Sequence, residues 1–174
     1  MNKTEIITFD SLPKNVDELR AAADMTTPFR TAALSVLAFL QYENDVNSAI
    51  AMVNYLKGPR PLSVFDTQFI RDRLGGKGYV IRSYFRGTSP GNNYTLPAPP
   101  YAIEVSDNPY SYTNEGYATL YLHSSGADSP RPVTLRLKPS TGEWFLWQHT
   151  FLADIRIPQS ADPWAQAPCP PIPV

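Results

Sequence analysis

The 174-residue sequence has a single cysteine, Cys169, and only two histidines. A lone cysteine has no partner within the chain, so an intramolecular disulfide is excluded and a cytoplasmic location is the simplest expectation. None of the spacings H-x-H, H-x-x-x-H or C-x-x-C occurs, and these are the common signatures of metal ligation. We therefore expect neither a metal site nor another cofactor.

The sequence also lacks an excess of either charge and any long apolar run. Its 15 basic and 16 acidic residues give a net charge of -1, whereas proteins that bind nucleic acid or anionic membranes present basic surfaces. The longest apolar run, residues 32–40, is interrupted by Ser35 and is far shorter than the roughly 20 residues of a membrane-spanning helix. The first residues contain no apolar stretch typical of a signal peptide. We expect neither nucleic acid nor membrane as a partner.

Helical periodicity dominates the first half of the chain. Four segments combine an N-cap residue with an apolar stripe at a spacing of three or four residues. Helices are predicted to begin after Asn15, after Thr27, after Asn44 or Asp45, and after Ser63. The last of them is expected to end at the glycine pair 75–76.

After Gly78 the pattern changes to that of strands, with aromatic and β-branched residues and alternating polarity. Strands are predicted at residues 79–85, 101–105, 117–123, 133–138, 144–148 and 153–157. Helices followed by strands, without alternation, indicate an α+β fold rather than a parallel sheet. We predict about four N-terminal helices packed on a curved antiparallel sheet of five or six strands.

The chain is interpreted as one domain and a tail. Residues 1–157 form the predicted domain, with a helical part over about 12–75 and a sheet part over 78–157. Residues 158–174 are rich in proline, which lacks the backbone N–H that a sheet requires, so we expect an extended or disordered tail.

No pattern identifies a catalytic site. The segment from His123 to Arg131 contains serine, histidine and aspartate close together, but it lacks the G-x-S-x-G turn of serine hydrolases. The glycine-rich run 75–78 follows a helix and precedes a predicted strand, the reverse of a phosphate-binding loop. We expect no catalytic residues, and an enzyme is the less favoured interpretation.

Loops rich in tyrosine, serine and asparagine join the predicted strands, and these residue types are common in adaptable binding surfaces. The candidate binding residues are Tyr110, Tyr112, His123, Asp128 and Arg131. The strands also carry more aromatic residues than a solvated sheet face normally has, namely Tyr79, Tyr101, Tyr117, Tyr121, Trp144 and Trp147. Either the sheet curls to bury these rings, or they line a cleft or an interface.

Five segments resemble a bacterial family of unknown function that is found in gut-associated clostridia: LKGPRPLS (56–63), QFIRDRL (68–74), VSDNPYSY (105–112), SSGADSPRPV (124–133) and DPWA (162–165). The resemblance covers about residues 12–165. It implies a bacterial origin and an intact single domain, and it supplies no catalytic residues. A weaker architectural resemblance, in helices followed by a curved sheet that ends in WFLW (144–147), is to the cone-shaped nuclear-transport-factor-like domains.

The leading functional hypothesis is a non-enzymatic module of a bacterial cytoplasmic protein, which binds another protein through its tyrosine-rich loops and a sheet face. The first alternative is a small-molecule-binding protein or enzyme with a pocket inside the curved sheet. The second alternative is a structural homo-oligomer that buries its aromatic sheet face by pairing sheets.

Overall fold

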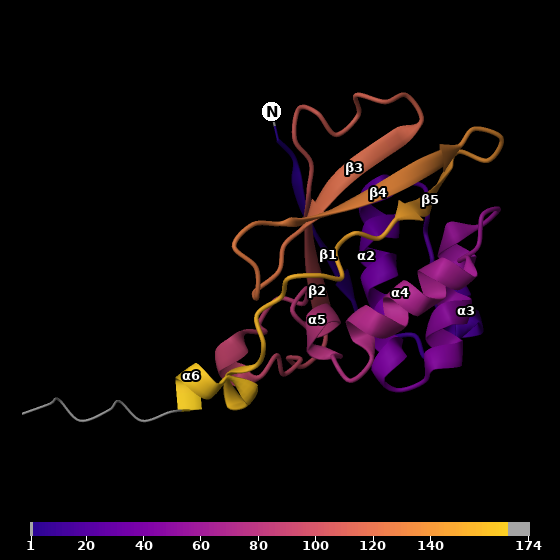
Figure 1. Cartoon of the computed structure of the whole chain (residues 1–174). Helices are drawn as coiled ribbons and strands as arrows, with labels where there is room; N and C mark the ends of the chain where they lie inside the picture. Colours follow the sequence, from indigo (N-terminus) through magenta and orange to yellow (C-terminus); the bar gives the residue numbers. More distant parts are fainter. Residues whose placement is uncertain (1, 167–174) are drawn as a thin grey trace, which may run out of the picture.

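Four helices follow one another in the first half of the computed structural model, which describes residues 2–166 (Figure 1). They are α1 (Val16–Ala22), α2 (Pro28–Leu40), α3 (Val46–Lys57) and α4 (Val64–Leu74). Each predicted N-cap is confirmed, because the side chains of Asn15, Thr27, Asp45 and Ser63 each accept a hydrogen bond from the backbone N–H three residues ahead. These caps satisfy donors that the first turn leaves without partners.

The strands form one antiparallel sheet in the order β1-β2-β3-β4-β5. The strands are β1 (Thr4–Phe9), β2 (Tyr101–Ser106), β3 (Tyr117–Leu122), β4 (Arg131–Lys138) and β5 (Glu143–Gln148). The sheet curls around α2, which contacts all five strands as well as α3 (Figure 1). This confirms the predicted α+β fold.

The core lies between the sheet and the helices, with α2 at its centre. Nearly every side chain of α2 is buried, because the sheet covers one side of the helix and α3 the other. Along the strands, alternate residues face α2: Ala118, Leu120 and Leu122 of β3 are buried, as are Val133 and Leu135 of β4. The opposite, outer face of the sheet carries the polar and aromatic members of these strands.

The strand predicted at residues 79–85 is wrong. Residues Tyr79–Arg82 form a single helical turn, α5, and only Phe85 pairs with the sheet, through an isolated bridge to Ile103. Val80, Ile81, Ser83, Tyr84 and Phe85 of this segment are all buried, so the segment does not show the alternating burial of a strand with one exposed face. The aromatic and β-branched composition favoured a strand, and tertiary packing overrode that preference.

The sequence interpretation placed no element before Asn15, and it missed β1. This strand pairs with β2 along its whole length, from Thr4 opposite Ser106 to Phe9 opposite Tyr101. Ile7 and Phe9 face the core, whereas Thr4, Ile6 and Thr8 are exposed. The sheet therefore joins the two ends of the domain and is not confined to the second half of the chain.

The strand predicted at residues 153–157 is also wrong. Asp154 adopts a positive φ of 61°, which breaks an extended run, and Arg156 donates its N–H to the carbonyl of Gly126. The remaining short helices are η1 (Gln41–Glu43), η2 (Pro90–Asn92), η3 (Gln159–Ala161) and α6 (Pro163–Gln166). The first part of the predicted tail thus forms two helical turns, and the prolines of segment 168–173 lie outside the described residues. Within residues 2–166, no helix has the length and apolar character needed to cross a membrane.

Candidate functional site: a basic and aromatic groove beside strand β5

The five candidate binding residues do not come together in the structure. Tyr110 and Tyr112 lie in the loop between β2 and β3, and both side chains are exposed. His123 and Asp128 belong to the connection between β3 and β4, and Arg131 is the first residue of β4, so all three lie at the other end of β3 (Figure 1). Six residues of strand separate the two loops, a distance of about 20 Å at 3.3 Å per residue. The five residues therefore do not form one continuous site.

Several of these side chains already have partners. The Tyr112 hydroxyl donates to the Asp107 carboxylate, and the Arg131 guanidinium donates to the Asp154 carbonyl. Asp128 forms an ion pair with Arg156. These contacts hold the loop side chains against other residues of the same chain. The binding of a partner by the loops remains a prediction.

Of the six aromatic residues singled out in the sequence, Trp144 packs partly buried against the core, and four others divide into two groups. Tyr79 stacks on Tyr94, Tyr101 packs edge-on against Phe85, and both pairs support the core. In contrast, Tyr117 and Trp147 meet edge to face on the outer side of the sheet, with ring centroids 5.8 Å apart. The outer pair marks the edge of a groove.

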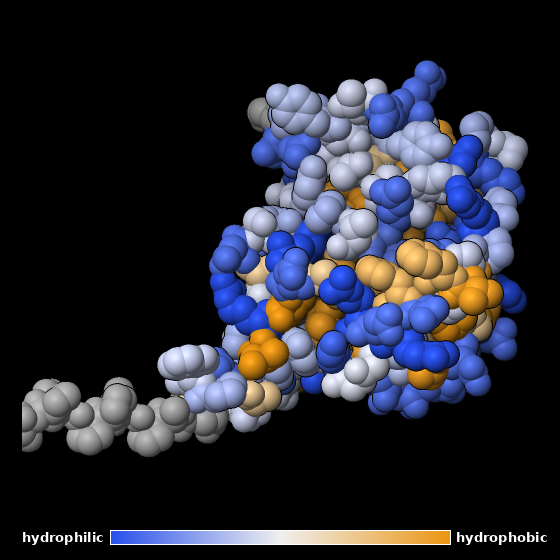
Figure 2. All heavy atoms as spheres, in the orientation of Figure 1, coloured by the Kyte–Doolittle hydropathy of each residue, from blue (hydrophilic) through white to orange (hydrophobic). Residues whose placement is uncertain are grey.

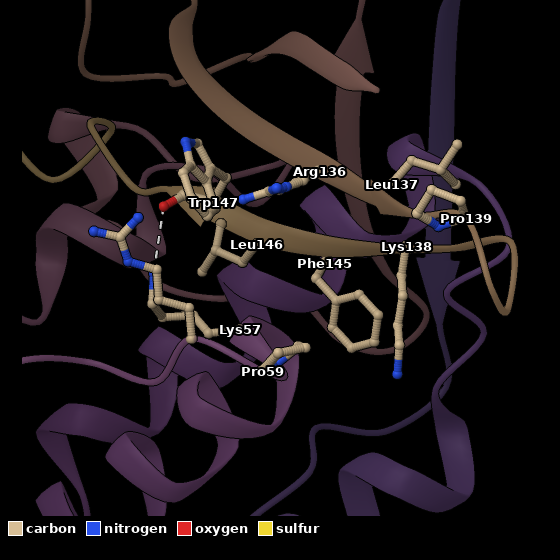
Figure 3. A pocket seen from close by; sticks show the side chains of 10 residues that line it. Lys57, Pro59, Arg136, Leu137, Lys138, Pro139, Phe145, Leu146 and Trp147 are labelled. Atoms are coloured by element: carbon tan, nitrogen blue, oxygen red, sulfur yellow. Dashed lines mark hydrogen bonds between the residues drawn. The ribbon is translucent and has the colours of Figure 1, made fainter. Parts of the chain in front are cut away.

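We define the β5 groove as two adjoining pockets that lie between β5 and the connection from α3 to α4. The basic pocket has a volume of about 260 Å³ and the His149 pocket about 350 Å³. Lys57, Arg60 and Trp147 line both pockets, so the two are continuous. Figure 3 shows Lys57 and Pro59 on the helical side of the basic pocket and Phe145, Leu146 and Trp147 on the strand side.

Strand β5 forms the floor of the groove. The helical layer lies against the free edge of this strand and forms hydrogen bonds with its backbone. Trp144 donates its N–H to the Met25 carbonyl over 2.8 Å and accepts a hydrogen bond from the Thr31 hydroxyl over 2.8 Å. Lys57 Nζ donates to the Trp147 carbonyl over 3.3 Å. These bonds satisfy backbone groups that an edge strand normally exposes, so β5 cannot accept a further strand there.

The end of α3 brings the connecting segment close to β5. The helix terminates at Gly58, whose φ of 61° is accessible to glycine at little cost. A Cβ atom at this position would lie only 2.5 Å from the Phe145 ring, so the absence of a side chain also permits the contact. Asn54 then accepts a hydrogen bond from the Leu62 N–H over 2.8 Å, which fixes the segment that carries Arg60.

The basic pocket concentrates positive charge in a protein whose net charge is -1. Lys57, Arg60, Arg136 and Lys138 line it, and none of the described residues around it is acidic. The guanidinium groups of Arg60 and Arg136 lie 4.8 Å and 4.6 Å from the centroid of the Trp147 ring. Cation–π contacts of this kind hold arginine side chains in place while leaving their N–H donors free for a ligand.

Lys57 is the most buried cation of the groove, with 6% of its surface exposed. Burial lowers the pKa of its amine, the nearby Asp66 carboxylate raises it, and Arg60 lowers it, with a net decrease. None of the ion pairs among residues 2–166 includes Lys57. Its charge is therefore available to an anionic group in the groove.

The His149 pocket is less basic and more polar than the basic pocket, because Asp66, Gln148 and Thr150 line it beside Phe65 and Phe69. His149 is 9% exposed, and its ring packs between Phe39 and Phe69. Burial, and then the positive charge of Lys57, lower the pKa of His149 to about 4. Its Nδ1 atom is buried without a hydrogen-bond partner among the described residues. At neutral pH the ring is consequently uncharged, and it adds no positive charge to the groove.

An exposed apolar patch borders the His149 pocket on the first turn of α4. Val64 and Phe65 are 84% and 77% exposed, and Phe65 lines the pocket together with Phe69. Figure 2 shows the hydrophobic surface over α4, surrounded by hydrophilic residues. Large apolar side chains left this exposed are typical of interaction surfaces.

Sequence reasoning missed most residues of the groove. Segment 56–63 was noted for its family resemblance, but its Lys57 and Arg60 were not connected with Arg136 and Trp147, which lie about 80 residues away. Only the pairing of strands with helices brings them together. Among residues 2–166, no three histidine, cysteine, aspartate or glutamate side chains gather in a cluster that could hold a metal ion.

Comparison with known proteins gives one match. A family model described as a domain of unknown function (DUF6935) matches residues 11–159, which is most of the chain and includes every residue of the groove. No curated protein and no solved structure matches the chain.

Proposed function

The chain belongs to the DUF6935 family, a family of unknown function as its sequence indicated, and we propose that it is a protein-binding module whose β5 groove binds an extended, acidic segment of a partner protein. The observation that carries this proposal is the composition of the basic pocket. Four cationic side chains and an aromatic wall surround a space that no described carboxylate lines. Such a surface is complementary to carboxylates carried on an apolar scaffold.

The shape of the groove supports an extended ligand. The basic pocket, at about 260 Å³, lies below the range of roughly 300–1,000 Å³ that encloses a typical small molecule, and the His149 pocket, at about 350 Å³, lies at the lower end of that range. The adjoining His149 pocket lengthens the groove along β5 toward Gln148 and Thr150. A peptide in an extended conformation could therefore place one side chain in each pocket.

The two pockets favour different side chains. Arg60 and Arg136 are held against Trp147, so their planar donor groups could form bidentate hydrogen bonds with an aspartate or glutamate. Phe65 and Phe69 offer an apolar surface at the other end. We propose that the recognised segment carries at least one acidic residue followed or preceded by a large apolar residue.

Binding through the backbone of β5 is not part of this proposal. The carbonyls of Trp144 and Trp147 are occupied by Thr31 and Lys57, and the Trp144 N–H by Met25. Recognition therefore depends on side chains of the groove and not on the addition of a strand.

A selection from a random peptide library displayed on phage, with the purified protein as bait, tests the proposal. We expect enriched peptides that combine acidic and aromatic or aliphatic residues. Their binding should be lost in the Arg60→Ala/Arg136→Ala variant and in the Trp147→Ala variant, and it should weaken with rising salt.

The matched control is Lys14→Ala/Arg86→Ala, which removes two exposed cations elsewhere on the molecule and changes the net charge equally. This control should bind the selected peptides like the unchanged protein. Selection of peptides without acidic residues, or equal losses in the control and the groove variants, would contradict the proposal.

A further inference from the structure

The two edges of the sheet differ in how they are protected. The helices and their connecting segment cover the edge of β5 through Met25, Thr31 and Lys57. At the other edge, β1 has no such cover. Within residues 2–166, no hydrogen bond outside the sheet involves Thr4, Ile6 or Thr8. We propose that two copies of this chain associate by pairing their β1 strands antiparallel, which joins the two sheets into one.

The register of the sheet shows which backbone groups of β1 are free. The carbonyls of Ala102 and Glu104 accept hydrogen bonds from Arg86 and His123, so these residues of β2 point away from β1. The intervening residues of β2, Ile103 and Val105, therefore point toward β1.

Ile103 and Val105 lie opposite Ile7 and Glu5. The backbone of these β1 residues consequently faces β2, and by alternation the N–H and C=O groups of Thr4, Ile6 and Thr8 face outward.

The outward groups of β1 are accessible and lack the usual protection against pairing. Thr4, Ile6 and Thr8 are all exposed, and 47% of the Ile6 surface is accessible. Edge strands of monomeric proteins are typically blocked by a proline, a bulge or an outward-facing lysine. Strand β1 has six residues, a regular register with β2 and none of these features. Its one charged residue, Glu5, lies on the same side as Ile7 and Phe9 and forms an ion pair with Lys3 of its own chain.

If a two-fold axis passes through Ile6, the outward N–H and C=O groups of β1 in one copy pair with those of β1 in the second copy. In this arrangement Ile6 lies opposite Ile6 of the other copy, and Thr4 lies opposite Thr8. All three residues point their backbone groups outward, so the alternation of an antiparallel ladder allows about six new hydrogen bonds.

The same register places Lys3 opposite Phe9, and Glu5 opposite Ile7. No like charges meet across the axis. The strand is therefore complementary to itself, and a second copy is the partner that matches it in both hydrogen bonding and charge.

Dimerisation through β1 is independent of the proposed peptide binding. Strands β1 and β5 are the opposite edges of the sheet, so both grooves stay accessible in the dimer. The interface is a single strand and lies at the low end of interface sizes, so we expect a reversible dimer that grows with protein concentration.

Analytical ultracentrifugation from micromolar to near-millimolar concentration tests the pairing. The unchanged chain should shift from monomer toward dimer, whereas Ile6→Lys and Ile6→Glu should each stay monomeric, because the new charge faces its own copy across the axis. An equimolar mixture of the two variants should form a heterodimer, which native mass spectrometry distinguishes by mass.

The control is Val46→Lys, since Val46 is 46% exposed on α3 and lies away from β1. This variant should dimerise like the unchanged chain. A strictly monomeric unchanged chain, dimers that persist in Ile6→Lys, or a mixture that yields no heterodimer would overturn the proposal. Thermal melting of each variant would confirm that the fold is retained, and recovery of the heterodimer would do so independently.

Discussion

At the residue scale, the lack of a side chain at Gly58 allows the end of α3 to pack closely against Phe145 of β5. The positive φ of Gly58 ends α3, and the Phe145 ring occupies the space where a Cβ would lie. The backbone conformation and the close approach are two separate requirements, and both are met at the same residue. Because Arg60 follows two residues later, the position of this cation depends on Gly58.

The substitution Gly58→Ala should therefore lower the free energy of unfolding more than a positive φ alone explains. Gly58 combines a φ of 61° with a ψ of -121°, a conformation outside the left-handed helical region that costs a residue with a Cβ about 1–3 kcal/mol. We expect a total loss of about 2–4 kcal/mol, with the remainder arising from overpacking against Phe145. Chemical denaturation of the purified variant measures this loss.

Gly142→Ala is the matched control, because Gly142 has a φ of 74° but open space around its Cβ position. It should lose only about 1 kcal/mol. Equal losses in the two variants would show that the contact with Phe145 carries no cost.

His149 should make the stability of the protein depend on pH. Its pKa is about 4 in the folded protein and 6.5 in the unfolded chain, so the unfolded state binds the proton between these values. The stability that the protein gains from keeping the His149 ring uncharged is fully present above pH 6.5, and it is lost as the pH falls toward 4. The pKa difference corresponds to about 3 kcal/mol. Urea denaturation at a series of pH values checks this dependence.

Replacing His149 by phenylalanine should flatten the curve between pH 4 and 6.5, because the ring is kept and the titrating group is removed. The unchanged protein, measured over the same pH series, is the reference for this comparison. A His149→Phe curve that keeps its full slope would contradict the assignment.

At the scale of elements, β5 depends on α2 for its free edge. The Thr31 side chain is fully buried, and its hydroxyl donates to the Trp144 carbonyl over 2.8 Å. The substitution Thr31→Val keeps the shape of the side chain and removes the donor. An unsatisfied buried carbonyl should cost about 1–3 kcal/mol of unfolding free energy, measured by denaturant unfolding.

Thr67→Val provides the comparison for this loss, because the Thr67 hydroxyl bonds only to carbonyls of its own helix at the surface. We expect a change below about 0.5 kcal/mol there. A Thr31→Val loss that is no greater would mean that the edge of β5 is not held by this bond.

The elements that sequence predicted correctly are those with local signals. The four helices have side-chain caps and apolar stripes, β2, β3 and β4 alternate in polarity, and β5 follows β4 across a short turn that contains Gly142, so a window of about ten residues contains the necessary information. Segment 79–85 failed because its residues suit a strand locally, while the core buries them as a helical turn. Strand β1 was missed since it gains its partner, β2, from about 95 residues away.

At the scale of the whole molecule, the groove could not be predicted because its residues come from segments that lie far apart in the sequence. Lys57 and Arg60 come from the end of a helix, and Arg136 and Trp147 from a hairpin, and neither segment alone is unusually basic. What sequence did indicate was an excess of aromatic residues on the strands. The structure shows that part of this excess supports the core and part, through Tyr117 and Trp147, borders the groove.

The central claim is that the β5 groove binds carboxylates of an extended segment, and a double-mutant cycle by isothermal titration calorimetry tests it most directly. The cycle combines the Arg136→Ala variant with a selected peptide in which one acidic residue is replaced by alanine. If the two groups are in contact, the losses in binding free energy will not add, and the coupling between them should be about 1 kcal/mol or more. Losses that add within about 0.3 kcal/mol for every acidic position, with Arg60→Ala as well as Arg136→Ala, would contradict the account.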